Sequence, residues 1–318
     1  MQNYNYDAEL RPYLSVLPSV IDLSTTELIR DFWTDFVSRR PPFEKSKSSS
    51  KISIENRTIP GLNGAPAIAI RIYRPKMASK AKLPGIYEIH GGGFVIGDLE
   101  MQDAWCANIA VEVGAIVVSV DYRLAPEHPF PAATNDCYAG FCWLFEHAEE
   151  LGIDPSRIAI SGQSAGACLA TATTLRARDS GGPKACFQLL EIPVFDDRME
   201  TASMLEFKNT PMWNHPNAIW GWQHYLGPDH CGDVSPYAAP ARAQDLSGLP
   251  DTYISTMEFD PLRDEGIEFA LRLMKAGVSV ELHSFPGTFH GSTVITAAKV
   301  SQRNTREIIE SLRNHLAR

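Results

Sequence analysis

The sequence has no surplus of positive charge. Lysine and arginine contribute 29 of its 318 residues and aspartate and glutamate contribute 38, so the formal net charge is −9 at pH 7. Proteins that bind nucleic acids neutralise phosphates with a concentrated basic surface. We therefore expect no nucleic-acid partner.

Cysteine is scarce and widely spaced. The six cysteines include no C-x-x-C pair, a distribution that predicts buried free thiols in a reducing compartment rather than a disulfide framework. Three histidines and one cysteine fall in a short stretch, but their spacing fits no compact zinc-ligand pattern (His215, His224, His230 and Cys231). No metal site is expected.

Long apolar runs are missing as well. A transmembrane helix needs about 18 apolar residues in succession, and the sequence contains no such run. Its first ten residues, MQNYNYDAEL, have neither the positive cluster nor the apolar stretch of a secretory signal. The sequence therefore predicts no membrane span and a cytoplasmic location.

What the sequence does contain is a repeated alternation of short apolar strands with helices. Period-two patterns at residues 52–54 and 68–72 predict a hairpin, and strand and helix patterns then follow in turn. This order predicts an α/β fold with a mostly parallel central sheet and helices on both faces. The expected strands are 86–89, 115–120, 157–160, 187–194, 252–257 and 278–283, and the expected helices are 102–113, 134–150, 165–178, 263–275 and 293–316.

Two segments fall outside this alternation. Residues 1–50 contain an amphipathic helix with an expected Ser24–Glu27 capping box, followed by a linker rich in serine and lysine. A long insertion at about residues 196–247 is rich in tryptophan and has no strand-like pattern. We predict that residues 1–50 and this insertion form a helical cap over a catalytic domain spanning residues 51–318.

Residues 162–166, Gly-Gln-Ser-Ala-Gly, match the pattern G-x-S-x-G between an expected strand and an expected helix. In a nucleophile elbow the turn is so sharp that the positions two residues either side of the serine must lack side chains. The turn presents the hydroxyl above the sheet and directs the helix N-terminus at developing negative charge. This context favours Ser164 as a nucleophile over a plain turn.

A second glycine-rich segment, HGGGF at residues 90–94, follows the expected strand 86–89. Glycines leave backbone N–H groups unshielded and able to approach a substrate oxygen. We therefore predict that the amides of Gly92, Gly93 and Ala165 form an oxyanion hole with three donors.

A dinucleotide site is the alternative interpretation of the same glycines. Gly91, Gly93 and Gly97 follow a strand, and Asp121 ends the next strand, where a ribose-binding acid would lie. The third glycine is one residue too far along the chain, and this interpretation leaves residues 162–166 without a role.

Asp260 and His290 follow the expected strands 252–257 and 278–283. Both therefore lie past the carboxyl ends of parallel strands, where open α/β sheets place their active sites. The chain order Ser164, Asp260, His290 is that of the α/β-hydrolase triad. A helix cap for Asp260 and an ordinary loop position for His290 are the alternatives, but four elements in one order favour a serine hydrolase.

The motifs at residues 90–94, 121–133, 162–166, 258–266 and 289–291 resemble those of the hormone-sensitive-lipase-like esterases, bacterial family IV, and EIPVFDDR at residues 191–198 resembles the heroin-esterase branch of that family. The resemblance implies an α/β-hydrolase fold with a pocket beneath a cap, no cofactor, and a possible homodimer. Most members have aspartate at the position of Gln163, and an aromatic or apolar residue is commoner at that of Ser292. We expect Gln163 to tune specificity rather than abolish activity.

The expected reaction is hydrolysis of a small-molecule ester through an acyl-enzyme on Ser164, with short acyl chains from acetyl to butyryl. A longer-chain lipase is one alternative. A non-catalytic small-molecule receptor on the same fold is another, disfavoured because His290 is present. We also expect an Arg123–Glu127 ion pair to support the glycine-rich segment, and Glu258 to orient the triad loop.

Overall fold

The computed structural model describes residues 4–17, 21–40, 43, 48–76, 81–228 and 232–317. Its central sheet has eight strands in the order β1-β2-β4-β3-β5-β6-β7-β8. The pairs from β4 through β8 are parallel, whereas β2 is antiparallel to both β1 and β4. The predicted, mostly parallel sheet is confirmed. The strands are β1 (Ile52–Ile59), β2 (Ile68–Pro75), β3 (Leu83–Ile89), β4 (Ile116–Asp121), β5 (Ile153–Gln163), β6 (Phe187–Glu191), β7 (Asp251–Phe259) and β8 (Val280–Phe289).

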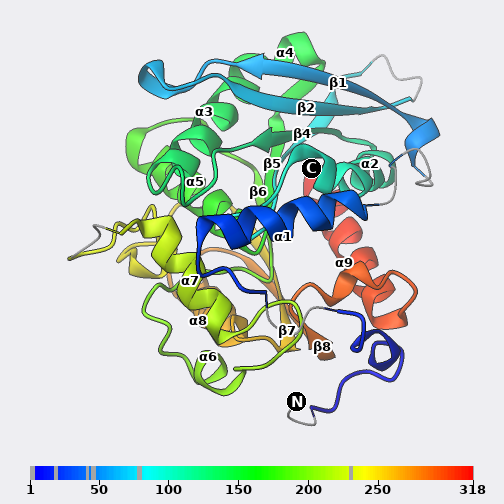
Figure 1. Ribbon diagram of the computed structural model, residues 1–318. Helices are drawn as coiled ribbons and strands as arrows, with labels where there is room; N and C mark the ends of the chain where they lie inside the picture. The colour runs from blue at the N-terminus through cyan, green and yellow to red at the C-terminus, as the bar shows by residue number, and fades with distance from the viewer. Residues whose placement is uncertain are drawn as a thin grey trace.

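Helices cover both faces of this sheet, and side chains of its inner strands β3, β4 and β6 are therefore buried on both sides. One core layer lies between the sheet and α3, α5 and α8, and the other lies between the sheet and α2 and α9. Figure 1 shows the two helix layers on opposite sides of the strands. The bounds are α2 (Asp103–Ile109), α3 (Ala132–Glu146), α4 (Ala148–Leu151), α5 (Ala165–Ser180), α8 (Arg263–Lys275) and α9 (Lys299–Leu316).

The segments outside the alternation contact each other. They contain α1 (Thr26–Ser38), α6 (Ala202–Glu206) and α7 (His215–Leu226), and α1 crosses in front of the sheet in Figure 1. The Asn217 amide donates to the carbonyl oxygen of Ile21 at 2.6 Å, and His224 Nε2 donates to that of Leu23 at 2.7 Å. Part of the N-terminal segment therefore packs on the insertion, while the division into cap and catalytic domain stays a prediction.

Two helix starts differ from expectation. The N-cap of α1 is Thr25, whose hydroxyl accepts the Leu28 amide at 3.3 Å, so the Ser24–Glu27 capping box is wrong. Helix α9 begins at Lys299 rather than at residue 293. The intervening Ile295 and Ala298 are buried against Leu10 and Tyr6 of the N-terminal segment, and this packing replaces the first helical turn.

Candidate active site

The loop between β5 and α5 forms a sharp elbow at Ser164. This serine has φ 55° and ψ −116°, a backbone conformation that residues other than glycine seldom adopt. A Cβ atom at Gly162 would lie 2.3 Å from the carbonyl oxygen of Gly166, and one at Gly166 would lie 2.0 Å from that of Ile89. Both flanking glycines are therefore required by space, as the pattern predicted.

Three side chains from distant parts of the chain meet above the elbow. His290 Nε2 lies 3.0 Å from Ser164 Oγ, and His290 Nδ1 lies 2.7 Å from Asp260 Oδ2. Asp260 directly follows β7 and His290 directly follows β8, and these neighbouring parallel strands bring them to one edge of the sheet. All three side chains are buried. Because a carboxylate only accepts, Nδ1 donates to Asp260, and Nε2 is left to accept the serine proton.

The glycine loop, which we define as residues 90–98, lies against this elbow. A Cβ atom at Gly91 would lie 2.9 Å from the carbonyl oxygen of Gln163 and 3.5 Å from Ser164 Cβ. Within the described residues, the amides of Gly92 and Gly93 donate to no protein acceptor. Ala165 is the first residue of α5, where a helix has no acceptor of its own for the N–H group. The site therefore combines a serine–imidazole pair with unused backbone donors nearby.

The residues preceding the acid and the base rest on an aromatic cluster that the sequence did not indicate. The Tyr6 ring lies 5.2 Å from Phe259 and 5.6 Å from Phe289, the neighbours of Asp260 and His290. Glu258 contacts the strand that leads to the base, since its Oε2 accepts the amide of Gly287, near the end of β8, at 2.6 Å. Its orienting role stays a prediction.

The expected Arg123–Glu127 ion pair is wrong. Arg123 donates from Nε and Nη2 to both carboxylate oxygens of Asp136 on α3, at 2.8 Å each. Glu127 instead binds Arg30 of α1, with Arg30 Nε 2.8 Å from its Oε1. Each charged group thus has a partner on a neighbouring helix, which local spacing could not indicate.

The predictions about metal sites and membrane spans can be compared with the described residues only. Within the described ranges, no three His, Cys, Asp or Glu side chains gather as a metal site would require. His230 and Cys231 lie outside those ranges. No helix among the described residues is long and apolar enough to cross a bilayer.

Comparison with known proteins identifies this arrangement. A family model described as the alpha/beta hydrolase fold matches residues 86–294, which include Ser164, Asp260 and His290. The chain belongs to the α/β-hydrolase family. A solved bacterial heroin esterase is 49% identical to this hydrolase, with a TM-score of 0.92 and 98% of each chain covered.

Curated relatives of the hydrolase also include esterases. Carboxylesterase NlhH of Mycobacterium tuberculosis is 42% identical over 246 residues, 76% of each chain. An arylesterase of Saccharolobus solfataricus is 32% identical over 304 residues, 91% of this chain and 95% of the relative. The resemblance to hormone-sensitive-lipase-like esterases is confirmed.

Beside Ser164 the surrounding side chains of the hydrolase leave a cavity of only about 10 Å³, roughly the room that one water molecule needs. The insertion supplies half of its lining, with Trp213, Ala218, Gly221 and Trp222 facing Gly93, Phe94, Ser164 and Val194. Two tryptophans of the insertion, Trp213 and Trp222, therefore form part of the cavity wall.

Two buried carboxyl groups lie in the sheet below the elbow. Burial raises the pKa of Glu88 to about 7. Burial, together with the charge of Glu88, raises the pKa of Glu191 to about 8. The carbonyl oxygen of Glu191 accepts the Ser164 amide at 2.8 Å, so this strand end supports the nucleophile directly. Both carboxyl groups are therefore protonated in the folded protein over a pH range where an exposed glutamate is ionised.

These raised pKa values predict that the folded state loses stability as pH rises. Below pH 4.5, the ordinary glutamate pKa, both states are protonated and there is no penalty. Above it only the unfolded state ionises freely, so each group lowers the unfolding free energy by about 1.4 kcal/mol per pH unit until its folded pKa is reached. In urea-unfolding measurements, Glu191→Gln should make the unfolding free energy decline less steeply between pH 5 and 8. The matched variant Glu310→Gln, at an exposed position, should leave it unchanged; equal curves for wild type and Glu191→Gln would contradict the prediction.

Proposed function

We propose that this protein is a serine carboxylesterase that hydrolyses short-chain esters, with Ser164, His290 and Asp260 as its catalytic triad. The observation that carries the proposal is the pair of hydrogen bonds, 3.0 Å and 2.7 Å long, that joins the three side chains in sequence. Such a chain, with a nucleophile, a base and a group that orients the base, is the signature of nucleophilic acyl transfer.

In the first half of the reaction, Ser164 Oγ forms a bond to the ester carbonyl carbon while its proton passes to His290 Nε2. The carbonyl oxygen becomes an oxyanion, and the amides of Gly92, Gly93 and Ala165 donate to it. Asp260 keeps the proton on Nδ1 and stabilises the imidazolium cation. The intermediate collapses as the alkoxy carbon–oxygen bond breaks, and His290 transfers its proton to the departing alcohol.

In the second half, water attacks the acyl-enzyme. His290 Nε2 accepts a proton from the water as the new carbon–oxygen bond forms, and the same amides bind the second oxyanion. The bond to Ser164 Oγ then breaks, the acid departs, and the serine recovers its proton from His290. No cofactor enters either half.

The tight packing beside Ser164 supports a preference for short acyl chains, from acetyl to butyryl. Trp213 lies over the glycine loop, where a Cβ atom at Gly93 would be 2.6 Å from its ring, and its ring centroid lies 6.0 Å from that of His290. The indole therefore fills space into which a longer acyl chain would extend. A series of p-nitrophenyl esters from acetate to palmitate tests this, and a preference for palmitate would favour the lipase alternative.

Trp213→Ala is expected to shift this preference toward longer chains. Pockets discriminate by about tenfold or more per methylene group, so the ratio of kcat/KM for octanoate to that for acetate should rise by at least about tenfold. The control is Trp220→Ala, because Trp220 lies on α7 outside the cavity lining. An unchanged ratio in Trp213→Ala would show that another feature limits acyl length.

The receptor alternative is separated from the enzyme by a fluorophosphonate probe. The probe phosphonylates an activated serine, so the enzyme should be labelled at Ser164, located by mass spectrometry of the modified peptide. A protein that only binds the ligand would stay unlabelled and would hydrolyse none of the esters.

A further inference from the structure

The N-terminal helix α1 contacts the glycine loop, and the role inferred for it below rests on the proposed function. Arg30 of α1 contacts both the outer part of the glycine loop and the segment that follows β4. Its Nη1 donates to the carbonyl oxygen of Val95, and its Nη2 donates to that of Ala125 at 3.0 Å. The Ala125 amide in turn donates to the carbonyl oxygen of Phe94 at 3.0 Å. Glu127 fixes the guanidinium through Nε.

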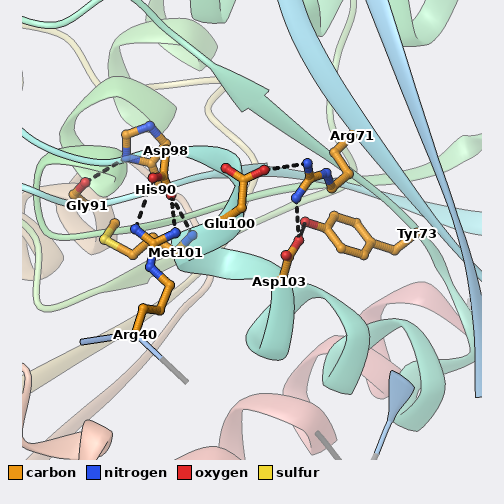
Figure 2. Close-up of polar contacts among 9 residues, drawn as sticks. All are labelled: Arg40, Arg71, Tyr73, His90, Gly91, Asp98, Glu100, Met101 and Asp103. Carbon is orange, nitrogen blue, oxygen red and sulfur yellow. Dashed lines mark hydrogen bonds and ion pairs between the residues drawn. The ribbon is translucent and has the colours of Figure 1, made fainter. Parts of the chain in front are cut away.

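Arg40, two residues after the end of α1, binds the last residue of the loop. Its Nη1 and Nη2 donate to the two carboxylate oxygens of Asp98 at 2.8 Å and 2.9 Å (Figure 2). Asp98 Oδ1 also accepts the Met101 amide at 2.7 Å and so caps the next helical turn. The Arg40 guanidinium lies 5.3 Å from the Trp33 ring. A paired, planar contact of this kind fixes orientation as well as charge.

The inner end of the loop is fixed without α1. His90 Nδ1 donates to the carbonyl oxygen of Gly91 at 2.7 Å (Figure 2). Its ring stacks on Tyr122 at 4.2 Å, and Gly97 lies so close to this ring that a Cβ atom there would be 2.2 Å from it. Burial lowers the pKa of His90 to about 4, so the ring is neutral and keeps these contacts near neutral pH.

The residues between these anchors carry the expected oxyanion donors. Gly92 and Gly93 both have positive φ, at 119° and 59°. Glycine reaches many backbone conformations at little energetic cost, so the direction of an amide at these positions depends on what holds the neighbouring residues. Oxyanion donors act only from a narrow range of positions about the reacting oxygen.

We propose that Arg30 and Arg40 are positioning residues, which hold the glycine loop so that its amides point at the oxyanion. Both arginines lie outside residues 86–294, the region matched by the family model. The N-terminal segment thus completes the catalytic machinery of the matched region, instead of only covering it. The roles are positional because neither guanidinium donates to Ser164, His290 or Asp260.

The test compares Arg30→Met, Arg40→Met and the double variant with a matched control, Arg39→Met. Arg39 has the same charge and lies next to Arg40, but its side chain is 76% exposed and pairs with Asp35 of the same helix. The measurements are kcat and KM for p-nitrophenyl acetate and the Ki of a trifluoromethyl ketone, which forms an oxyanion when the serine adds to it. Each single change should lower kcat about tenfold and raise Ki in parallel, because poorer donor alignment weakens binding of the oxyanion alone. KM should stay within about twofold of wild type, and Arg39→Met should behave as wild type.

Several outcomes would overturn the proposal. Wild-type kcat and Ki in the double variant would show that α1 only covers the loop. A raised KM at constant kcat would place the arginines in substrate binding. If a methionine variant fails to fold, Arg40→Lys replaces it, since lysine keeps the charge but loses the paired geometry; full kcat in that variant counts against the proposal. A wild type that hydrolyses no ester and takes up no fluorophosphonate would instead reject the proposed function itself.

Discussion

Ser164→Ala is expected to lower kcat for p-nitrophenyl butyrate by about six orders of magnitude, because alanine removes the nucleophile and with it the covalent path. Alanine deletes the hydroxyl that lies 3.0 Å from His290 Nε2 and leaves the backbone elbow in place. Steady-state hydrolysis at high enzyme concentration measures the loss. Labelling by the fluorophosphonate should disappear in the same variant.

Two controls make this result decisive. Ser156→Ala changes an exposed serine at the start of the same strand, β5, and should keep wild-type kcat and labelling. Any activity that remains in Ser164→Ala and is abolished by fluorophosphonate comes from a contaminating esterase. The assignment of Ser164 is wrong if the variant keeps more than about one per cent of wild-type kcat after that correction, because loss of the nucleophile leaves far less residual activity.

The features that the sequence could predict are those set by short-range pattern. Ser164 lies between an apolar strand and a helix. Its flanking glycines are required because a Cβ atom at Gly162 would meet Gly166 in the same turn, and one at Gly166 would meet Ile89 of the neighbouring strand β3. Asp260 and His290 could be located because each follows a buried parallel strand, and such strands end at one edge. The bounds of α8, Arg263–Lys275, agree with the expected helix because its apolar periodicity and its ends are both clear.

The features that could not be predicted depend on which distant groups become neighbours. Arg30 and Glu127 are 97 residues apart, and no periodicity relates them. Proximity in the chain favours a pair between Glu127 and Arg123, yet the Nε and Nη2 groups of Arg123 donate to Asp136 on α3. Tyr6 likewise packs beneath residues that precede the acid and the base, a contact created only by tertiary folding. The contacts that support the site therefore depend on tertiary folding, whereas the triad itself follows from local pattern and strand order.

Asp260→Asn should lower kcat by about four orders of magnitude while leaving the fold intact. Asp260 Oδ1 accepts the Leu262 amide at 2.9 Å, and Oδ2 accepts His290 Nδ1–H at 2.7 Å. In the variant, the asparagine oxygen has to stay at the first position to satisfy the buried Leu262 amide. Its NH₂ group then faces His290 and donates to Nδ1, so the imidazole proton moves to Nε2.

A proton on Nε2 opposes catalysis directly, because that nitrogen can no longer accept the proton of Ser164. NMR of ¹⁵N-histidine-labelled protein should therefore show the Nδ1–H tautomer of His290 in wild type and the Nε2–H tautomer in Asp260→Asn. Asp264→Asn is the matched control, since Asp264 lies in the first turn of α8, close to Asp260 in the chain, but accepts from Ser203 and Arg263 rather than from His290. An Asp260→Asn enzyme with the wild-type tautomer and more than about a tenth of wild-type kcat would show that this carboxylate only supports the turn before α8 through the Leu262 amide, since a tautomer-setting aspartate contributes far more.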